Sequence, residues 1–276
     1  MPTFFDQLRD AMEFEASISG SIVPLDRRAP APDELSRLPS GVAGEDEVSG
    51  DKALSSTKRR APGSGTKQLS PGLTALHDRI PADSPIRRIS DLDALRAWVT
   101  ETVLIPLDDA RLNPVFGVGR PDADVMVVGE APGADEDRQG EPFVGRAGQL
   151  LTKILEAIGF ARDEVYIANI LKSRPPRNRD PLPTEVEAHI PILFKQIVLI
   201  QPKIILCVGR TAGNSLLQLN ESLRNLRQRF HDFHGIPVVV TYHPAALLRN
   251  PQWKRPTWDD VRMLRDRYDS MLAPPA

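Results

Sequence analysis

Cysteine is nearly absent from the chain: its 276 residues include Cys207 and no other. A framework of disulfides within the chain is therefore excluded. Cys207 lies in the apolar run KIILCVG, so we expect a small buried hydrophobe and not a reactive thiol. Low cysteine content is typical of proteins in reducing compartments, and we expect a cytoplasmic protein.

Long apolar runs are missing as well. No stretch reaches the roughly 18 consecutive apolar residues that a transmembrane helix needs. The N-terminal stretch MPTFFDQLRDAMEF has early acidic residues and no apolar core, which is unlike a secretory signal. The sequence therefore predicts no role for a membrane.

Charge is balanced overall but not along the chain. Lys and Arg outnumber Asp and Glu by 20 to 13 in residues 138–276 and are outnumbered by 24 to 15 in residues 1–137, so net charges of +7 and −9 give the total of −2. A basic half is able to bind a polyanion such as nucleic acid even in a mildly acidic chain. Ordinary solvated arginines on surface helices would give the same count.

Composition divides the chain into three parts. Residues 1–23 place Phe5, Leu8 and Met12 at helical spacing, which predicts a short amphipathic helix. Residues 24–88 are rich in Pro, Ser, Gly and mixed charge and have few large apolar side chains, so we expect a disordered linker. Residues 89–276 are expected to form the folded domain, which opens with a helix over 91–103 that Asp91 caps.

Strands and helices alternate in the folded domain. The four expected strands are short and rich in Val and Ile, and they cover 124–128, 165–170, 203–208 and 237–242. The expected helices cover 146–159, 184–200, 210–219 and 257–271. Continuous apolar strands separated by helices are typical of a parallel sheet buried on both faces. We therefore predict an α/β protein, a three-layer α/β/α sandwich with a four-stranded parallel sheet.

Polar residues follow these strands at the edge where ligands bind in such sheets. Each of them alone has an ordinary explanation as a turn or loop residue, but together they would share one rim. The segment EAPG after the first strand lacks the Gly-Lys-Ser/Thr ending of a phosphate-binding loop. The residues concerned are Glu130, Glu136, Phe143, Asn169 and His243, with Arg174, Arg177, Arg179, Arg210 and Arg249 around them.

Four motifs in this part of the chain resemble one known family. They are GEAPGADEDRQGEPFVGRAG, YIANILKSRPPRNRDP, VGRTA and TYHPAALLRNPQWKRPTWDDV. In this order and spacing they are similar to the family 4 branch of the uracil-DNA glycosylase superfamily, from about residue 106 to residue 271. The resemblance implies an α/β/α sandwich with a four-stranded parallel sheet. It also implies that uracil is flipped out of DNA and that its N-glycosidic bond is hydrolysed.

The resemblance also implies roles for single residues. Phe143 would stack on the flipped uracil, Asn169 would read its Watson–Crick edge, and His243 would donate to uracil O2. Glu130 and Glu136 match positions linked with the attacking water and the charged intermediate. The substrate-binding positions of the pattern are Gly129, Ala131, Phe143 and Asn169.

Elementary chemistry agrees with these roles. An asparagine amide has a donor and an acceptor, which pair with O4 and N3–H of uracil and mismatch cytosine.

Ala131 stands where another branch carries an Asp general base, so the water would be held by Glu130, Glu136 or a backbone carbonyl. Thymine must be excluded sterically, and Gly133 lies where a bulkier blocking residue sits in another branch, which leaves the blocking residue open.

The expected partner is uracil-containing DNA, bound by a monomer. Arginine side chains and helix starts bind phosphates, and a leucine in LLRNP, Leu247 or Leu248, would act as a wedge in the base stack unless both belong to the core. The expected DNA-binding residues are Arg146, Arg174, Arg177, Arg210, Leu248 and Arg249.

The family 4 pattern includes four cysteines that hold an iron–sulfur cluster, and this chain has none of them. The matching positions are Thr102, Ile105, Ser173 and His189. Such clusters are held by thiolates, so we predict no cluster and no cofactor. We expect packing by Ile105, Leu107 and the helix over 91–103 to fasten these segments instead.

Other functions remain open on the sequence alone. The chain could be a non-catalytic protein that binds DNA or uracil, because loss of the four cysteines can mark a degenerated enzyme. It could also be a glycosylase for another deaminated base, such as hypoxanthine or xanthine. A nucleotide-binding α/β enzyme is disfavoured, because neither a phosphate-binding loop nor a GxGxxG fingerprint is present.

Overall fold

The structure is a computed structural model that describes residues 68–273. The helix expected over 1–23 and residues 24–67 of the expected linker lie outside the described residues. The described part forms one compact unit that begins at Gln68.

A mixed sheet of six strands lies at the centre of the unit, in the order β1-β3-β2-β4-β6-β5. The four central strands are parallel, and the edge strands β1 and β5 pair antiparallel with their neighbours. The predicted four-stranded parallel sheet is thus present, with two additional edge strands. The bounds are Val118–Gly119 (β1), Val125–Gly129 (β2), Tyr166–Asn169 (β3), Ile204–Val208 (β4), His231–Phe233 (β5) and Ile236–Thr241 (β6).

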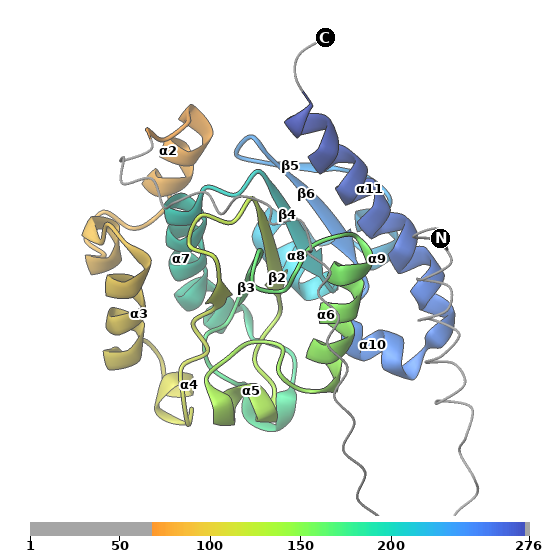
Figure 1. Cartoon of the computed structure of the whole chain (residues 1–276). Coiled ribbons are helices and arrows are strands. Elements are labelled where there is room, and N and C mark those ends of the chain that lie inside the picture. The colour runs from red at the N-terminus through yellow and green to blue at the C-terminus, as the bar shows by residue number, and fades with distance from the viewer. Residues whose placement is uncertain (1–67, 274–276) are drawn as a thin grey trace, which may run out of the picture. The chain divides into compact units, whose positions relative to one another are not determined.

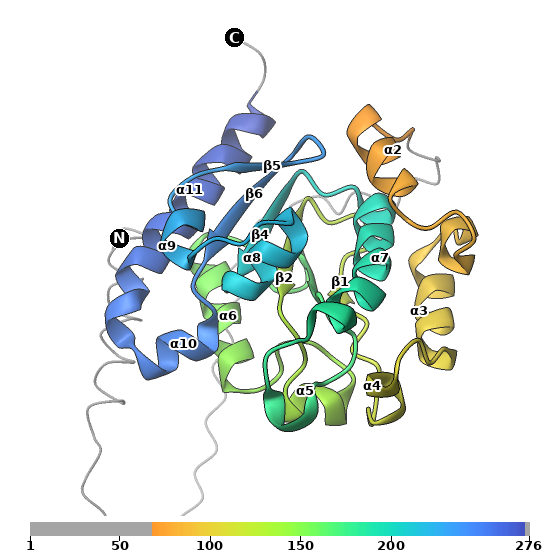
Figure 2. The ribbon, with the colours of Figure 1, turned by 180° about the vertical axis from the view of Figure 1, so that it is seen from behind.

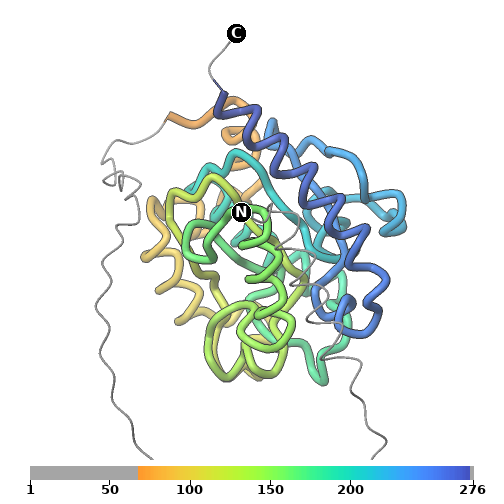
Figure 3. The backbone as a smooth tube through the Cα atoms, turned by 45° about the vertical axis from the view of Figure 1, so that its right-hand side comes forward, coloured from red at the N-terminus to blue at the C-terminus, as the bar shows by residue number. Residues whose placement is uncertain are grey.

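Helices cover both faces of the sheet, as expected for an α/β/α sandwich. Figures 1 and 2 show α6 (Arg146–Ala157) and α11 (Lys254–Leu272) on one face, with α7 (Pro183–Ile200) and α8 (Arg210–Leu217) on the other. In Figure 3, α11 runs diagonally along its face of the sheet. The predicted helices are confirmed, with ends shifted by up to three residues.

Register aligns the carboxyl ends of the parallel strands. Gly129 at the end of β2 pairs with Asn169 at the end of β3, and Val208 of β4 pairs with Thr241 of β6. The segments that leave these strands therefore start along one edge of the sheet. Cys207 is fully buried in β4, which confirms the expected small hydrophobe.

The N-terminal part of the described chain corrects the predicted linker. The helix α2 (Pro71–Asp78) begins at the Ser70 cap, and its Leu73 and Leu76 are buried in contact with the core. The expectation that the linker extends to residue 88 is therefore wrong. Its Pro and Ser content hid the helical spacing of a few buried leucines, which are stabilised by packing against α7.

The next elements tie this segment to the core. The helix expected from residue 91 is confirmed as α3, and the Asp91 carboxylate caps it by accepting from Ala94 N at 2.8 Å. The remaining elements are η1 (Pro85–Arg88), α3 (Leu92–Glu101), α4 (Pro106–Asp109), α5 (Ala134–Gln139), η2 (Pro176–Asn178), α9 (Leu223–Leu226), α10 (Pro244–Arg249) and η3 (Pro251–Trp253). Among residues 68–273, no helix combines the length and apolarity that a membrane crossing requires.

Candidate active site

A pocket of about 410 Å³ opens at the carboxyl ends of the parallel strands. Its walls come from the segment after β2, the end of β3, the turn around η2, and α10 after β6. The structure thus brings together residues that are more than 100 positions apart in the sequence. The lining includes these predicted site residues: Glu130, Ala131, Glu136, Phe143, Asn169, His243 and Arg249.

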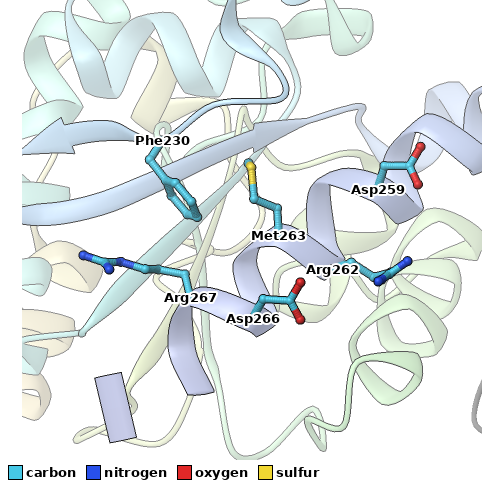
Figure 4. A pocket seen from close by; sticks show the side chains of 6 residues that line it. All are labelled: Phe230, Asp259, Arg262, Met263, Asp266 and Arg267. Carbon is cyan, nitrogen blue, oxygen red and sulfur yellow. The ribbon is translucent and has the colours of Figure 1, made fainter. Parts of the chain in front are cut away.

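A second hollow lies elsewhere, beside α11. Figure 4 shows Phe230 facing this helix, while the charged side chains of Asp259, Arg262 and Arg267 spread away from one another. None of the site residues predicted from the motifs is among its lining residues. The pocket at the strand ends is therefore the candidate active site.

Asn169 is the best-defined polar group of the pocket. Its side chain is 2% exposed, and its Oδ1 atom is buried without a hydrogen-bond partner in the protein. Buried acceptors are nearly always paired, so an unpaired one at a pocket wall points to a donor supplied by a ligand. Gly129 lies opposite Asn169 in the sheet, where an added Cβ would overlap the Asn169 amide and come within 2.6 Å of Phe143 Cζ.

Lys172 supports Asn169 from behind, and sequence reasoning missed it. Its fully buried Nζ donates to the backbone carbonyl of Asn169 and to Gln196 Oε1, both at 2.7 Å. Gln196 in turn donates to Phe116 O at 2.9 Å. Burial lowers the pKa of Lys172 to about 7. A lysine directly after the apolar run YIANIL was the only signal that could have identified it.

Phe143 forms an aromatic wall of the pocket. The residue has a φ of +56°, a left-handed conformation that is costly for a side chain of this size, and it is 6% exposed. Its ring centroid lies 5.5 Å from that of His243, with the planes tilted by 31°. A strained aromatic therefore lies next to the unpaired amide in the wall of the pocket.

His243 has a defined tautomer. Its Nδ1 accepts a hydrogen bond from Ala245 N at 3.2 Å, so the proton of the neutral ring lies on Nε2. Burial and, to a lesser extent, the positive Arg249 lower the pKa of His243 to about 4, against a smaller opposing effect of Glu136. At neutral pH the imidazole is therefore an uncharged donor.

Glu136 holds the loop that carries Phe143. Its Oε2 accepts from Gly133 N at 3.1 Å, and its Oε1 accepts from Val144 N at 3.1 Å and Gly145 N at 3.3 Å. Both carboxylate oxygens are thus occupied by backbone groups. This geometry favours a positioning role over the predicted contact with water.

Glu130 and Asp180 are the other carboxylates that line the pocket. Burial raises the pKa of Glu130, and Asp180 adds to the rise, whereas a hydrogen bond with Thr211 and the charge of Arg210 oppose it. Its backbone carbonyl accepts from Leu171 N at 3.1 Å, which fixes the segment to the chain after β3. No described hydrogen bond ties the Glu130 carboxylate to a backbone donor, in contrast to the carboxylate of Glu136.

The predicted DNA-binding residues lie around this pocket without all lining it. Arg146, at the first position of α6, is exposed, as are Arg177, Arg210 and Arg249. Arg174 is half-buried, and its Nε donates to Asn178 Oδ1 at 2.7 Å. Of the two candidate wedges, Leu247 is buried and Leu248 is half-buried, so Leu248 alone has surface available for a base step.

The four positions that match cluster cysteines do not suit an iron–sulfur cluster. Thr102, Ile105, Ser173 and His189 include no thiolate, and the buried Cys207 belongs to β4. The space between Thr102 and His189 has no room even for a water molecule. Within the described range of 68–273, no cluster of three or more His, Cys, Asp or Glu side chains has the geometry of a metal site.

Comparison with known proteins defines the class. The model of the uracil DNA glycosylase superfamily matches residues 116–262, which include all the strands from β1 to β6, and the chain belongs to this superfamily. Within it, the chain is similar to type-4 uracil-DNA glycosylases. It is 41% identical to that of Archaeoglobus fulgidus over 59% of this chain and 81% of the relative. The type-4 enzymes of Pyrobaculum aerophilum (40%; 63% of this chain, 92% of the relative) and Thermotoga maritima (42%; 55% and 80%) are similar to the same degree.

Proposed function

We propose that this protein is a uracil-DNA glycosylase, which hydrolyses the N-glycosidic bond of uracil in DNA and so begins base-excision repair. The relatives that carry the name type-4 uracil-DNA glycosylase align with this chain over most of their own length. The observation that carries the proposal is the meeting of three groups in one pocket. They are the unpaired Oδ1 of Asn169, the ring of Phe143 and the neutral imidazole of His243.

Uracil enters this pocket after leaving the base stack. The bond to be cleaved is out of reach inside a duplex, and extrusion of the base costs a few kcal/mol. Stacking on Phe143 offsets part of that cost, since one base–aromatic contact is worth about 1–3 kcal/mol. A pocket of about 410 Å³ is large enough to take a single base.

Asn169 reads the base. Its Oδ1 accepts from uracil N3–H, and its Nδ2 donates to uracil O4. Cytosine presents an acceptor at N3 and donors at N4, so it would leave both ends of a fixed amide unpaired. Burial of the amide makes that mismatch costly, which gives the preference for uracil.

His243 assists the departure of the base. As the glycosidic bond lengthens, negative charge develops on uracil and positive charge on the sugar. The Nε2–H of the neutral ring donates to uracil O2 and stabilises the first of these charges, in the manner of an oxyanion hole. The hydrogen bond from Ala245 N fixes the tautomer that this step requires.

Glu130 serves the sugar side. In its ionised form it stabilises the positive charge on the sugar and orients the water that attacks it. Glu136 contributes through the loop, because its oxygens are bound to Gly133, Val144 and Gly145. Exposed Arg146, Arg177, Arg210 and Arg249 contact DNA phosphates, with Leu248 as the wedge.

A cleavage assay tests the proposal. Single- and double-stranded oligonucleotides with one uracil, one hypoxanthine or no lesion are incubated with the purified protein, and alkali reveals abasic sites. Abasic product from uracil is the expected result. Cleavage at hypoxanthine alone would show that the substrate is another deaminated base. Tight binding without abasic product would show that the protein is a non-catalytic relative.

A further inference from the structure

A buried polar network joins four segments beside the active site. Asp108, on α4, is 1% exposed in its side chain and accepts hydrogen bonds from Leu104 N at 3.0 Å and Ile105 N at 3.3 Å. Its other oxygen accepts from the Ser173 hydroxyl and lies 3.1 Å from His189 Nε2, a close contact without the alignment of a hydrogen bond. Helix α7 and the segment after β3 are thereby connected to α4.

Arg111 extends this network to α3. Its guanidinium donates to Asp108 Oδ1 at 3.3 Å and to Ser173 Oγ at 3.2 Å. It also donates to three carbonyl oxygens at the end of α3, Val99 O at 2.7 Å, Thr102 O at 3.1 Å and Thr100 O at 3.4 Å. Only 8% of the Arg111 side chain is exposed, so the guanidinium neutralises a buried carboxylate.

The network continues through Lys172 to the backbone of Asn169. Lys172 N donates to His189 Nδ1 at 2.9 Å, which places the imidazole between Asp108 and the Lys172 backbone. Lys172 Nζ donates to Asn169 O at 2.7 Å. From Asp108 to Asn169 every step is therefore a contact between buried groups.

We propose that Asp108, Arg111, Ser173 and His189 form a metal-free clamp at the positions where the type-4 pattern implies a cluster, and that this clamp positions Asn169 through Lys172. The expected packing of Ile105, Leu107 and the 91–103 helix against the core is present, and the clamp adds ionic and hydrogen bonds to it. Ser173 and His189 stand at two of the cysteine positions themselves. The other two, Thr102 and Ile105, contribute through backbone groups.

The chemistry of the donors separates the clamp from a metal centre. An iron–sulfur cluster needs thiolates and space, whereas this site has hydroxyl, carboxylate, guanidinium and imidazole groups and no room for a water molecule. The charged groups face partners within the network, so replacing one partner leaves another charge buried and uncompensated. The clamp therefore predicts a stability that does not depend on iron.

Metal content is the first test. The full-length protein, produced in iron-supplemented cells and purified without air, is assayed for iron and acid-labile sulfide and melted with and without a chelator. We expect iron well below one atom per chain and the same melting temperature in both samples. Stoichiometric iron and sulfide, or a chelator-sensitive melting temperature, would overturn the proposal.

Asp108→Asn tests the fastening. The change leaves Arg111 and His189 without their carboxylate, and we expect the melting temperature to fall by about 10 °C. Asp122→Asn is the matched control, because Asp122 is exposed and pairs with Arg120 on the surface. Ser173→Ala, a milder change, serves if Asp108→Asn does not fold. A melting temperature equal to that of the control for both clamp variants would contradict the clamp.

Positioning of Asn169 is tested by a double-mutant cycle, and this part rests on the proposed function. Below the melting temperatures, kcat/KM for a uracil oligonucleotide is measured for Ser173→Ala, Lys172→Met and the double variant. We expect kcat/KM to fall by about tenfold in each single variant. Because both residues act on Asn169 by the same path, we expect kcat/KM of the double variant to be close to that of the more impaired single variant. The Asp122→Asn control keeps the wild-type value.

The outcomes of this cycle are distinct. If Ser173→Ala lowers the melting temperature but keeps the wild-type kcat/KM, the clamp stabilises the fold without positioning Asn169. Losses of kcat/KM that multiply in the double variant would lead to the same conclusion. If the wild-type protein cleaves no uracil-containing DNA, the proposed function fails, while iron content and melting still decide the clamp.

Discussion

Asn169 and His243 gain their proposed roles from burial. An exposed asparagine pairs with water, and an exposed histidine is partly charged near pH 6.5. Within the pocket, Asn169 keeps an unpaired acceptor, and the pKa of His243 falls to about 4. The residue types were already visible in the motifs, but these two properties depend on surroundings built from several segments.

Asn169→Ala removes both hydrogen bonds to the base. Each of the two hydrogen bonds contributes about 1 kcal/mol net, so we expect their loss to lower kcat/KM for uracil by about 10- to 100-fold. The measurement is single-turnover cleavage of a uracil oligonucleotide, with Asn225→Ala on the surface as the control. Unchanged cleavage would remove Asn169 from the site.

His243 and Glu130 both limit the reaction at acid pH. Burial raises the pKa of Glu130, which acts in its ionised form, so we expect the rate to fall first as Glu130 takes up a proton. The lowered pKa of His243 keeps its ring neutral down to about pH 4, so we expect a second fall as pH drops through about 4. His243→Ala should lose about 100- to 1,000-fold in kcat, and His243→Gln, which keeps a donor, less. A rate that falls already near pH 6.5, with this limb lost in His243→Gln, would show that the ring titrates at its ordinary pKa and contradict the assignment.

The same titration affects stability. Between about pH 4 and 6.5 the unfolded chain binds a proton at His243 that the folded chain does not. This group therefore makes the free energy of unfolding rise with pH across that window, and its contribution is lost as pH falls. Urea melts of wild type and His243→Gln at pH 4.5 and 7 measure the difference.

At the scale of elements, the loop between α5 and α6 is the strained part of the site. Phe143 holds a positive φ there, and Glu136 ties Gly133 to Val144 and Gly145 across the loop. A carboxylate that accepts three backbone hydrogen bonds is able to stabilise such a conformation. The strain of Phe143 is thus offset by a residue seven positions earlier.

Glu136→Gln tests this loop. The amide NH2 that replaces one carboxylate oxygen cannot accept from a backbone N–H, so one side of this set of hydrogen bonds is lost. We therefore expect KM to rise by about 3- to 10-fold and the melting temperature to fall by a few degrees. Faster proteolysis near residue 143 should accompany both changes. Glu141→Gln, exposed in the same loop, is the control. A loss confined to kcat would instead place Glu136 next to the attacking water.

At the scale of the whole molecule, exposed arginines from distant segments surround the pocket. Arg146 begins α6, Arg177 lies in η2, Arg210 begins α8, and Arg249 ends α10. These four arginines belong to the basic part of the chain, residues 138–276, so part of its excess positive charge lies near the pocket. Phosphate contacts of this kind release counterions, so binding weakens as salt rises.

Arg249→Ala tests this surface. We expect weaker binding to single-stranded DNA of any sequence and a slope of log K against log salt that is smaller by about 0.7. Fluorescence anisotropy between 50 and 200 mM salt measures both. Arg120→Ala, which lies near the amino ends of the strands, should leave the slope unchanged. Equal slopes for Arg249→Ala and wild type would exclude a phosphate contact.

The sequence by itself determined the sandwich, its four parallel strands, the longer helices and the rim of polar residues. Apolar runs and helical periodicity are local patterns, and local patterns fix such elements. It did not determine β1 and β5, whose two- and three-residue strands are too short for a period, or α2, whose few leucines stand among prolines and serines.

Only the tertiary structure decided how Glu136, Lys172 and Asp108 are used. Asp108 meets Ser173 across 65 positions, and Lys172 meets Gln196 across 24, so neither pair leaves a periodic trace in the sequence. The absence of cysteine at the four matching positions excluded an iron–sulfur cluster as the means of fastening these segments. The groups that connect these segments instead are the side chains that the fold buries together. A buried charge is stable only next to charged or hydrogen-bonding partners, and the tertiary structure alone decides which partners those are.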